Sequence, residues 1–359
     1  MDDGAGPLID HPGTGGMVRR GDWQAQAIAT HDLCRAALSQ GRLSDARALA
    51  GYTLVEAQEP VDLYLEWVPQ IRVFLAERGV DRSHVQADEA ELLELLWPGC
   101  GGTPDPAADW ARVRALVAEA QAACDAGHAA AAEAALEASR ELWRDTHDRM
   151  CDWVQGMIAI VARRAGEASV GPLWERLMAP MFDSYERYDT DRAPWSQSAE
   201  TLLHVTAEAL RGHLSGPGRR GSLEFVQEAD RIGFRFRPCG SGGRNETGET
   251  IGTYPRTTAR HDWAWNMEGV CLYCAHCCAL SEVNPIRRFG YPAREVEPPF
   301  RTTEASRDYC TWWVYRDPRL VPEHVYARTG NRKPAEIGGA ATRAGQAAKA
   351  PPGGDDPAA

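Results

Sequence analysis

The sequence contains no run of about 18 apolar residues, so it predicts no transmembrane helix. Its N-terminus lacks the basic stretch followed by an apolar stretch that marks a secretory signal. Basic residues are also scarce: 39 Lys and Arg stand against 51 Asp and Glu, a formal net charge of −12. Binding to nucleic acid or to anionic membranes relies on basic faces that neutralise phosphate. We therefore expect a cytoplasmic protein with no nucleic-acid or membrane partner.

Familiar catalytic signatures are missing as well. The chain contains no Gly-x-Ser-x-Gly and no His-Glu-x-x-His sequence. A Gly-rich loop runs from Cys239 to Arg244, but it lacks the Lys-Ser/Thr ending of a phosphate-binding loop. The loop instead predicts a close approach of the backbone to a ligand or to cysteine sulfurs. Arg244 is a candidate for orienting a substrate carboxylate, and the alternative is a solvent-exposed loop arginine.

Cysteine is concentrated in the last third of the chain. The segment GVCLYCAHCC, residues 269–278, holds four cysteines and one histidine, and two more cysteines flank it at a distance. In a reducing cytosol, clustered cysteines are more often metal ligands or reactive thiols than disulfides. A pair separated by two residues presents both sulfurs to one tetrahedral ion, and distant segments supply the other ligands. We predict a metal site formed by Cys239, Cys274, Cys277 and Cys310.

Alternatives remain open within this cluster. Cys271 and His276 are alternate ligands, and His276 is also a candidate catalytic residue for proton transfer. Zinc is the expected metal, although the spacing of Cys271, Cys274 and Cys277, with a fourth cysteine, also suits a [4Fe–4S] cluster. The remaining interpretation is a group of unliganded thiols, because free cysteine is often buried.

Residues 21–188 are rich in alanine and carry apolar residues at helical spacing. Two stretches match at an offset of 86 residues, which pairs Trp67 with Trp153 and Gly41 with Gly127. We interpret residues 21–98 and 109–188 as two copies of a helical unit, with a chance match of two alanine-rich stretches as the alternative. Two copies are too few for an extended solenoid, so we expect a compact helical body. Its paired helices are a candidate surface for a protein partner.

The second copy carries the polar residues of greatest chemical interest. His147 stands where the first copy has Val61. On the same predicted helix, Asp148 and Asp152 are neighbours at a spacing of four residues. We therefore regard His147, Asp148 and Asp152 as candidate catalytic residues. The alternative is a solvated acidic face beside a buried tryptophan.

The pattern changes after residue 188. Residues 198–214 predict a further helix, and residues 223–228 and 232–237 predict a β-hairpin that leads to Cys239. Residues 309–315 also have strong β character. Residues 1–20 and 330–359 have the composition of a disordered lead and a disordered tail.

The order of several motifs suggests a resemblance. A helix with HDxxxDW is followed by a hairpin ending in RPCGSGGR, then by YCAHC and by CTWWVYRDP. From about residue 140 to 325 this order resembles an uncharacterised cysteine-rich bacterial family and, more distantly, the L-2-amino-thiazoline-4-carboxylate hydrolase-like group. The resemblance implies a small-molecule hydrolase acting on a C–N or C–S centre. It assigns no catalytic residue here.

Together these patterns predict an α+β protein, mainly a helical body with an internal duplication. Residues 197–328 are expected to form a helix and a small Cys-rich metal-binding β subdomain. The first functional hypothesis is a small-molecule enzyme, hydrolase- or lyase-like, that acts on a small anionic molecule beside a Cys-ligated metal. The alternatives are a non-catalytic helical adaptor or regulatory protein with a structural zinc, and an iron–sulfur redox protein.

Overall fold

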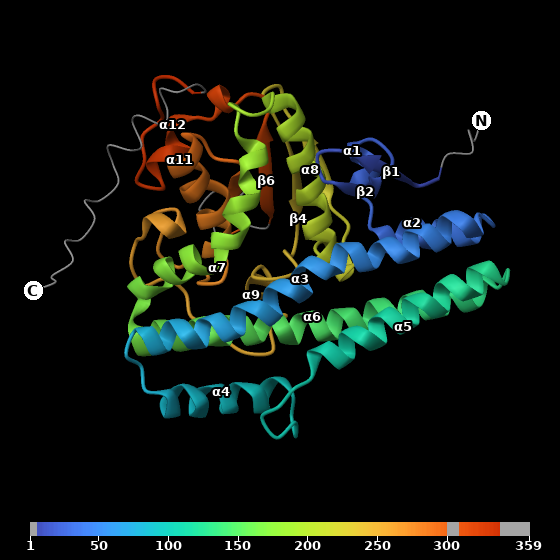
Figure 1. Cartoon of the computed structure of the whole chain (residues 1–359), viewed down its shortest axis with the longest axis horizontal. Coiled ribbons are helices and arrows are strands. Elements are labelled where there is room, and N and C mark those ends of the chain that lie inside the picture. Colours follow the sequence, from blue (N-terminus) through green and yellow to red (C-terminus); the bar gives the residue numbers. More distant parts are fainter. Residues whose placement is uncertain (1–5, 300–308, 338–359) are drawn as a thin grey trace, which may run out of the picture.

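The computed structural model describes residues 6–299 and 309–337. They form a mainly helical body, a short N-terminal hairpin and a four-stranded antiparallel sheet (Figure 1). The α+β prediction is confirmed at this level. The main helices are α2 (Thr30–Ser39), α3 (Leu43–Glu77), α4 (Arg82–Leu96), α5 (Pro106–Asp125), α6 (Ala129–Ala165), α7 (Val170–Ser184) and α8 (Trp195–Gly212).

Two helical hairpins form the body: α2 with α3, and α5 with α6. Each hairpin turns at a glycine with positive φ, 73° at Gly41 and 79° at Gly127, a conformation that glycine adopts without steric cost. Helices α3 and α6 begin 86 residues apart, at Leu43 and Ala129, as the repeat interpretation requires. The duplication itself stays a prediction, because similar helix boundaries also arise in unrelated helical hairpins.

The helices that follow the two hairpins take different places. Helices α4 and α7 are both 15 residues long. Figure 1 shows α4 lying along α6 on the side away from the sheet, whereas α7 runs between the long helices and the sheet. Both halves meet the Cys-rich part of the chain: the Tyr64 hydroxyl of α3 lies 3.0 Å from that of Tyr273, and Trp174 of α7 donates to the Leu272 carbonyl at 3.0 Å.

The larger sheet has the strand order β3-β4-β6-β5, with all neighbours antiparallel. Its strands are β3 (Glu224–Gln227), β4 (Arg231–Phe236), β5 (Glu295–Glu297) and β6 (Cys310–Tyr315). The predicted hairpin and the predicted strand at residues 309–315 are therefore confirmed. All six residues of β6 are buried, which explains their β-branched and aromatic character.

Residues 1–20, expected as a disordered lead, include a hairpin of β1 (Leu8–His11) and β2 (Gly16–Arg19). The buried Arg19 guanidinium holds it in place by donating to the Ile28 carbonyl at 2.7 Å and to Thr30 Oγ1 at 2.8 Å. Thr30 in turn donates to Glu56 Oε1 at 2.7 Å. Composition alone missed this network, because its partners lie far along the chain. The tail prediction falls largely on residues 338–359, outside the described residues.

One hydrophobic core extends across the helices and the Cys-rich part. It joins side chains such as Tyr64 of α3, Trp174 of α7 and Phe234 of β4 with the buried Cys271 and Cys310. The Cys-rich part therefore packs into the same core as the helices. Among the described helices, none is long and apolar enough to cross a membrane.

Candidate functional site

The cysteine cluster begins a nearly continuous helical segment. Helix α10 (Ala275–Cys278), a π-helical turn (Ala279–Val283) and α11 (Asn284–Phe289) follow one another without a break. Cys274 and Cys277 are three residues apart at the start of this segment, so they lie on one face. Cys310 is the first residue of β6 and pairs in register with Phe236, the last residue of β4, three residues before Cys239.

These elements bring the four predicted ligands together. Cys239, Cys274, Cys277 and Cys310 line one small void of about 20 Å³, which we call the thiol cavity. Their sulfur atoms do not converge to coordination distance: within residues 6–299 and 309–337, no three of them lie within 4.8 Å of one another. A tetrahedral zinc with Zn–S bonds of about 2.3 Å would hold its sulfurs about 3.8 Å apart. Four cysteines are a donor set that zinc accepts, but their sulfurs are not placed at coordination distance in this structure.

The backbone of the Gly-rich loop packs directly against these cysteines. A Cβ on Gly242 would lie 2.5 Å from Cys274 Sγ, and one on Gly243 would lie 2.6 Å from Cys239 Cβ. No side chain has room at either position without a shift of its neighbours. The expectation of close backbone approach is confirmed.

The other cysteines of the cluster lie outside the thiol cavity. Cys271 Sγ accepts a hydrogen bond from Asn245 Nδ2 at 3.4 Å and lies 3.9 Å from Gln155 Oε1. Cys278 Sγ accepts from the Trp265 backbone N–H at 3.3 Å. The alternate ligand Cys271 thus faces the α6 side of the protein.

His276 lines the thiol cavity with a defined ring orientation. Its Nδ1 lies 2.6 Å from the Tyr273 carbonyl oxygen, which only accepts, so Nδ1 carries the proton. Nε2 is then the unprotonated nitrogen, and it lies 3.4 Å from Cys277 Sγ. Burial lowers the pKa of His276 to about 4, which keeps the ring neutral at physiological pH. The ring is thus ready to accept a proton or to donate a lone pair to a metal.

Burial sets the protonation of the thiols as well. It raises the pKa of Cys277 and of Cys310 well above 9, and neighbouring Cys239 adds to both shifts. These cysteines are therefore thiols at neutral pH. A cation in the cavity would reverse this, because metal coordination deprotonates a thiol.

A larger cavity of about 230 Å³ adjoins the thiol cavity and shares the side chains of Tyr273, His276 and Trp312 with it. We call it the central cavity. Its other walls come from α3, α7 and α8 and are largely aromatic and apolar. Apart from tyrosines, its charged or titratable lining side chains are Glu59, Arg187, His213, His276 and Arg294.

Arg294 is the charged group best placed to bind a ligand in the central cavity. Its side chain is buried and lies over the Trp312 ring, 4.7 Å from the centroid. It donates to Thr206 Oγ1 at 3.0 Å and to Tyr185 Oη at 3.3 Å, but its Nε has no hydrogen-bond partner among the described residues. Burial raises the pKa of Glu59, against the opposing charges of Arg294 and Arg187. A buried cation with a spare donor thus lies near a carboxyl with a raised pKa.

The predicted catalytic residue His147 lies behind this cavity. Its ring is fully buried, with Nδ1 2.9 Å from Asp148 Oδ1 and Nε2 2.9 Å from Nδ1 of His213. Burial lowers the pKa of His147 to about 4. His213 lines the central cavity and contacts the Tyr64 hydroxyl at 3.3 Å. His147 is therefore connected to the central cavity by its contact with His213.

Asp152 and Arg244 form a fully buried ion pair. Asp152 also accepts from the Ile251 backbone N–H at 2.6 Å, and the Arg244 guanidinium lies 3.6 Å from Asp148 Oδ1. Neither residue lines the thiol cavity or the central cavity. The pair fixes the Gly-rich loop to α6, whereas Arg294 lines the central cavity. Arg294, Glu59 and His213 carry no sequence signal that marks them, because their meeting depends on how helices and sheet pack.

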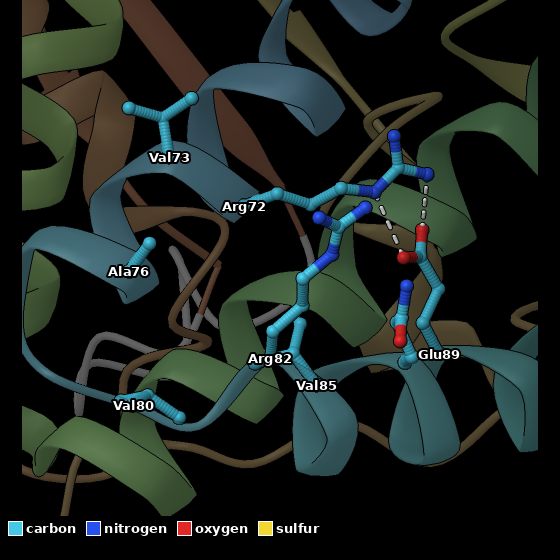
Figure 2. A pocket seen from close by; sticks show the side chains of 8 residues that line it. Arg72, Val73, Ala76, Val80, Arg82, Val85 and Glu89 are labelled. Atoms are coloured by element: carbon cyan, nitrogen blue, oxygen red, sulfur yellow. Dashed lines mark hydrogen bonds and ion pairs between the residues drawn. The ribbon is translucent and has the colours of Figure 1, made fainter.

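A separate surface groove of about 500 Å³ lies between α3 and α4. Val73, Val80 and Val85 provide part of its apolar wall (Figure 2). At one end of the groove, Arg72 and Glu89 form a bidentate ion pair with N–O distances of 2.7 and 2.8 Å. The groove contains no cysteine or histidine, so it offers a surface for contact and none of the chemistry of the other two cavities.

No family model, curated protein or solved structure matches the chain.

Proposed function

We propose that the protein is a cytoplasmic enzyme that acts on a small anionic molecule bound in the central cavity. The observation that carries the proposal is the buried Arg294, whose Nε is unpaired and whose neighbours include a carboxyl and a neutral imidazole. A cavity of 230 Å³ lies just below the usual 300–1,000 Å³ of sites for drug-sized ligands, so its ligand is small. Arg294 binds the carboxylate, since guanidinium and carboxylate form charge-assisted hydrogen bonds.

Proton transfer falls to groups that line the same cavity. His276 Nε2 is unprotonated and accepts a proton, either from the substrate or from the Cys277 thiol. Glu59 is the candidate proton donor to a leaving group, because its raised pKa favours the protonated carboxyl. These roles suit a hydrolase- or lyase-type reaction at a C–N or C–S centre, the class that the motif resemblance also implies.

The test of this proposal is a comparison of Arg294→Met with the wild-type protein. We expect a panel of small carboxylates, including L-2-amino-thiazoline-4-carboxylate, to contain a ligand whose affinity falls about 10- to 100-fold, because a charged hydrogen bond contributes about 1.5–3 kcal/mol. Isothermal titration measures the affinity, and product formation measures turnover. Arg294→Lys keeps the charge and should retain part of the binding, while Arg287→Met changes an exposed arginine of α11 and should have no effect. Equal binding by Arg294→Met and wild type would reject the proposal.

A metal in the thiol cavity is the second part of the proposal. Cys239, Cys274, Cys277 and Cys310 would hold it, with His276 as an alternate ligand, and the ion would deprotonate the thiols and polarise a bound substrate. A void of about 20 Å³ favours a single zinc ion over an eight-atom [4Fe–4S] cluster. Cys271, which the cluster would need from the close run, does not line the thiol cavity, although its thiol lies beside that of Cys274 as well as against Asn245 and Gln155.

Metal content tests this part directly. Anaerobically purified wild-type protein is expected to contain about one cysteine-bound zinc per chain with no visible absorbance, as four cysteines suit one tetrahedral ion. The double variant Cys274→Ser/Cys277→Ser should lose that zinc by elemental analysis. Cys100→Ser, at a cysteine remote from the cavity, should keep it. Visible absorbance with bound iron would favour the redox alternative, and metal-free folded wild-type protein would exclude both.

The groove between α3 and α4 supports one competing function, non-catalytic binding of a protein partner. An adaptor of this kind would use the helical body as its binding surface and zinc as a structural element. The Arg294→Met comparison separates the two functions, because an adaptor has no need of the central cavity.

A further inference from the structure

Three potential metal ligands meet on the other side of the molecule, where the N-terminal hairpin packs against α8. His11 is the last residue of β1, and Glu200 and His204 are one turn apart on α8. Each offers one nitrogen or oxygen atom, and these atoms all lie within 4.8 Å of one another. Within residues 6–299 and 309–337, no other group of three His, Cys, Asp or Glu side chains meets this criterion. Figure 1 shows the hairpin beside α8, far along the chain from it.

Packing fixes the position of His11. The turn after β1 lies so close to α8 that a Cβ on Gly13 would be 1.9 Å from Thr201 Oγ1. The ring centroids of His11 and His204 lie 4.8 Å apart, and those of Trp23 and His204 lie 4.9 Å apart. The hairpin is also anchored by the buried Arg19, as described above. The three ligands are thus held by tertiary contacts that exist without an ion.

Their donor atoms are available. His204 is only 7% exposed, and neither it nor Glu200 forms a hydrogen bond or ion pair with any residue that the structure describes. A metal ion at this site would therefore displace no protein partner from His204 or Glu200. His11 Nδ1 accepts one long hydrogen bond, 3.3 Å, from the Thr14 backbone N–H, which metal binding at that nitrogen would replace.

We infer that His11, Glu200 and His204 bind a divalent transition-metal ion such as zinc. Two imidazoles and one carboxylate form a ligand set that zinc and similar ions accept, and three protein ligands leave coordination positions open. A surface groove of about 250 Å³, lined in part by Trp23 and Glu200, adjoins the site and gives an exchangeable ligand access to it. Because its ligands come from β1 and α8, the ion would tie the N-terminal hairpin to the helical body. The inference is independent of the proposed function, since it shares no residue with the thiol or central cavity.

Cobalt(II) is the probe that distinguishes this site from the cysteines. Cobalt bound to thiolates gives strong sulfur-to-metal charge-transfer absorption, whereas cobalt bound by nitrogen and oxygen does not. We expect the full-length Cys274→Ser/Cys277→Ser variant, which lacks two of the proposed thiol-cavity ligands, to bind one Co²⁺ without this absorption, and the substitutions that follow are made in this background. Glu200→Gln and His11→Ala should each weaken its affinity at least about tenfold, since even partners of a ligand contribute 10- to 100-fold. His84→Ala, at an exposed histidine of α4, is the matched control and should bind as wild type.

A second measurement keeps the inference testable if a histidine variant is unstable. Glu200 is exposed, so Glu200→Gln should fold normally. Added Co²⁺ should slow amide hydrogen exchange in β1 and β2 of the wild type and leave that of Glu200→Gln unchanged. Equal Co²⁺ affinity with and without Glu200→Gln and His11→Ala would overturn the inference, as would binding that always carries thiolate absorption. Loss of binding only in Cys274→Ser/Cys277→Ser would place the metal in the thiol cavity alone.

Discussion

The buried His31 is expected to lower the free energy of unfolding of the wild-type protein as the pH falls from 6.5 to 4. In the variant His31→Gln, the free energy of unfolding should fall by about 3 kcal/mol less over this range than in the wild type. His31 is buried on α2, and burial lowers its pKa from 6.5 to about 4, with Glu56 opposing and Arg140 and Arg220 adding to the shift. The folded protein therefore keeps this ring neutral, while the unfolded chain protonates it below pH 6.5. The stability is fully present above pH 6.5 and declines as the pH falls to about 4, by about 1.4 kcal/mol per pH unit.

Urea unfolding at a series of pH values measures this effect. In the wild type, the buried His147 and His276 contribute with the same sign, because burial lowers each pKa to about 4. Glu59, Glu208 and Glu282 have raised pKa values and act in the opposite direction, so the comparison of variants is more telling than the wild-type curve. His84→Gln, at an exposed site, should follow the wild-type profile. A His31→Gln profile parallel to wild type would contradict the prediction.

Arg244→Met is expected to destabilise the protein by about 3–5 kcal/mol, the cost of removing one partner from a buried ion pair. The side chains of Arg244 and Asp152 are both 0% exposed, so the variant leaves a carboxylate without its cation in the core. Burial raises the pKa of Asp152, and Arg244 opposes that rise, so loss of the arginine also favours the protonated acid. Urea unfolding at neutral pH measures the loss.

Two further variants interpret this result. Arg163→Met removes an arginine that is 59% exposed and pairs with Asp88, so it should cost no more than about 1 kcal/mol. The double variant Arg244→Met/Asp152→Asn should recover part of the stability, because no uncompensated charge remains. A loss below about 1 kcal/mol for Arg244→Met would mean that water reaches Asp152, and would reopen the role of Arg244 as a ligand-binding residue.

Local patterns predicted much of the fold. Period-two alternation marked β4, the short segment before it was expected as its hairpin partner, and aromatic and β-branched residues marked β6. The four cysteines around the thiol cavity were also predictable, since a two-residue spacing and two strand ends place sulfurs at one edge of the sheet.

The remainder depends on tertiary contacts. Whether Arg244 meets a substrate or Asp152 is decided by how α6 lies against the Gly-rich loop, which no local pattern encodes. The same holds for Arg294, which becomes a cavity residue only where β5 and β6 meet α8. The hairpin at residues 8–19 looked disordered for a similar reason: Arg19 finds its partners in the next helices.

The π-helical turn Ala279–Val283 has a consequence for the evolution of the chain. Such a turn amounts to one extra residue within an α-helix. Glu282, on this turn, is fully buried and accepts from the Val296 backbone N–H at 2.8 Å and from Arg328 Nε at 2.9 Å. Deleting one residue here would restore a regular helix and rotate Cys274 and Cys277 by about 100° relative to α11. A single-codon deletion would therefore turn both sulfurs away from Cys239 and Cys310.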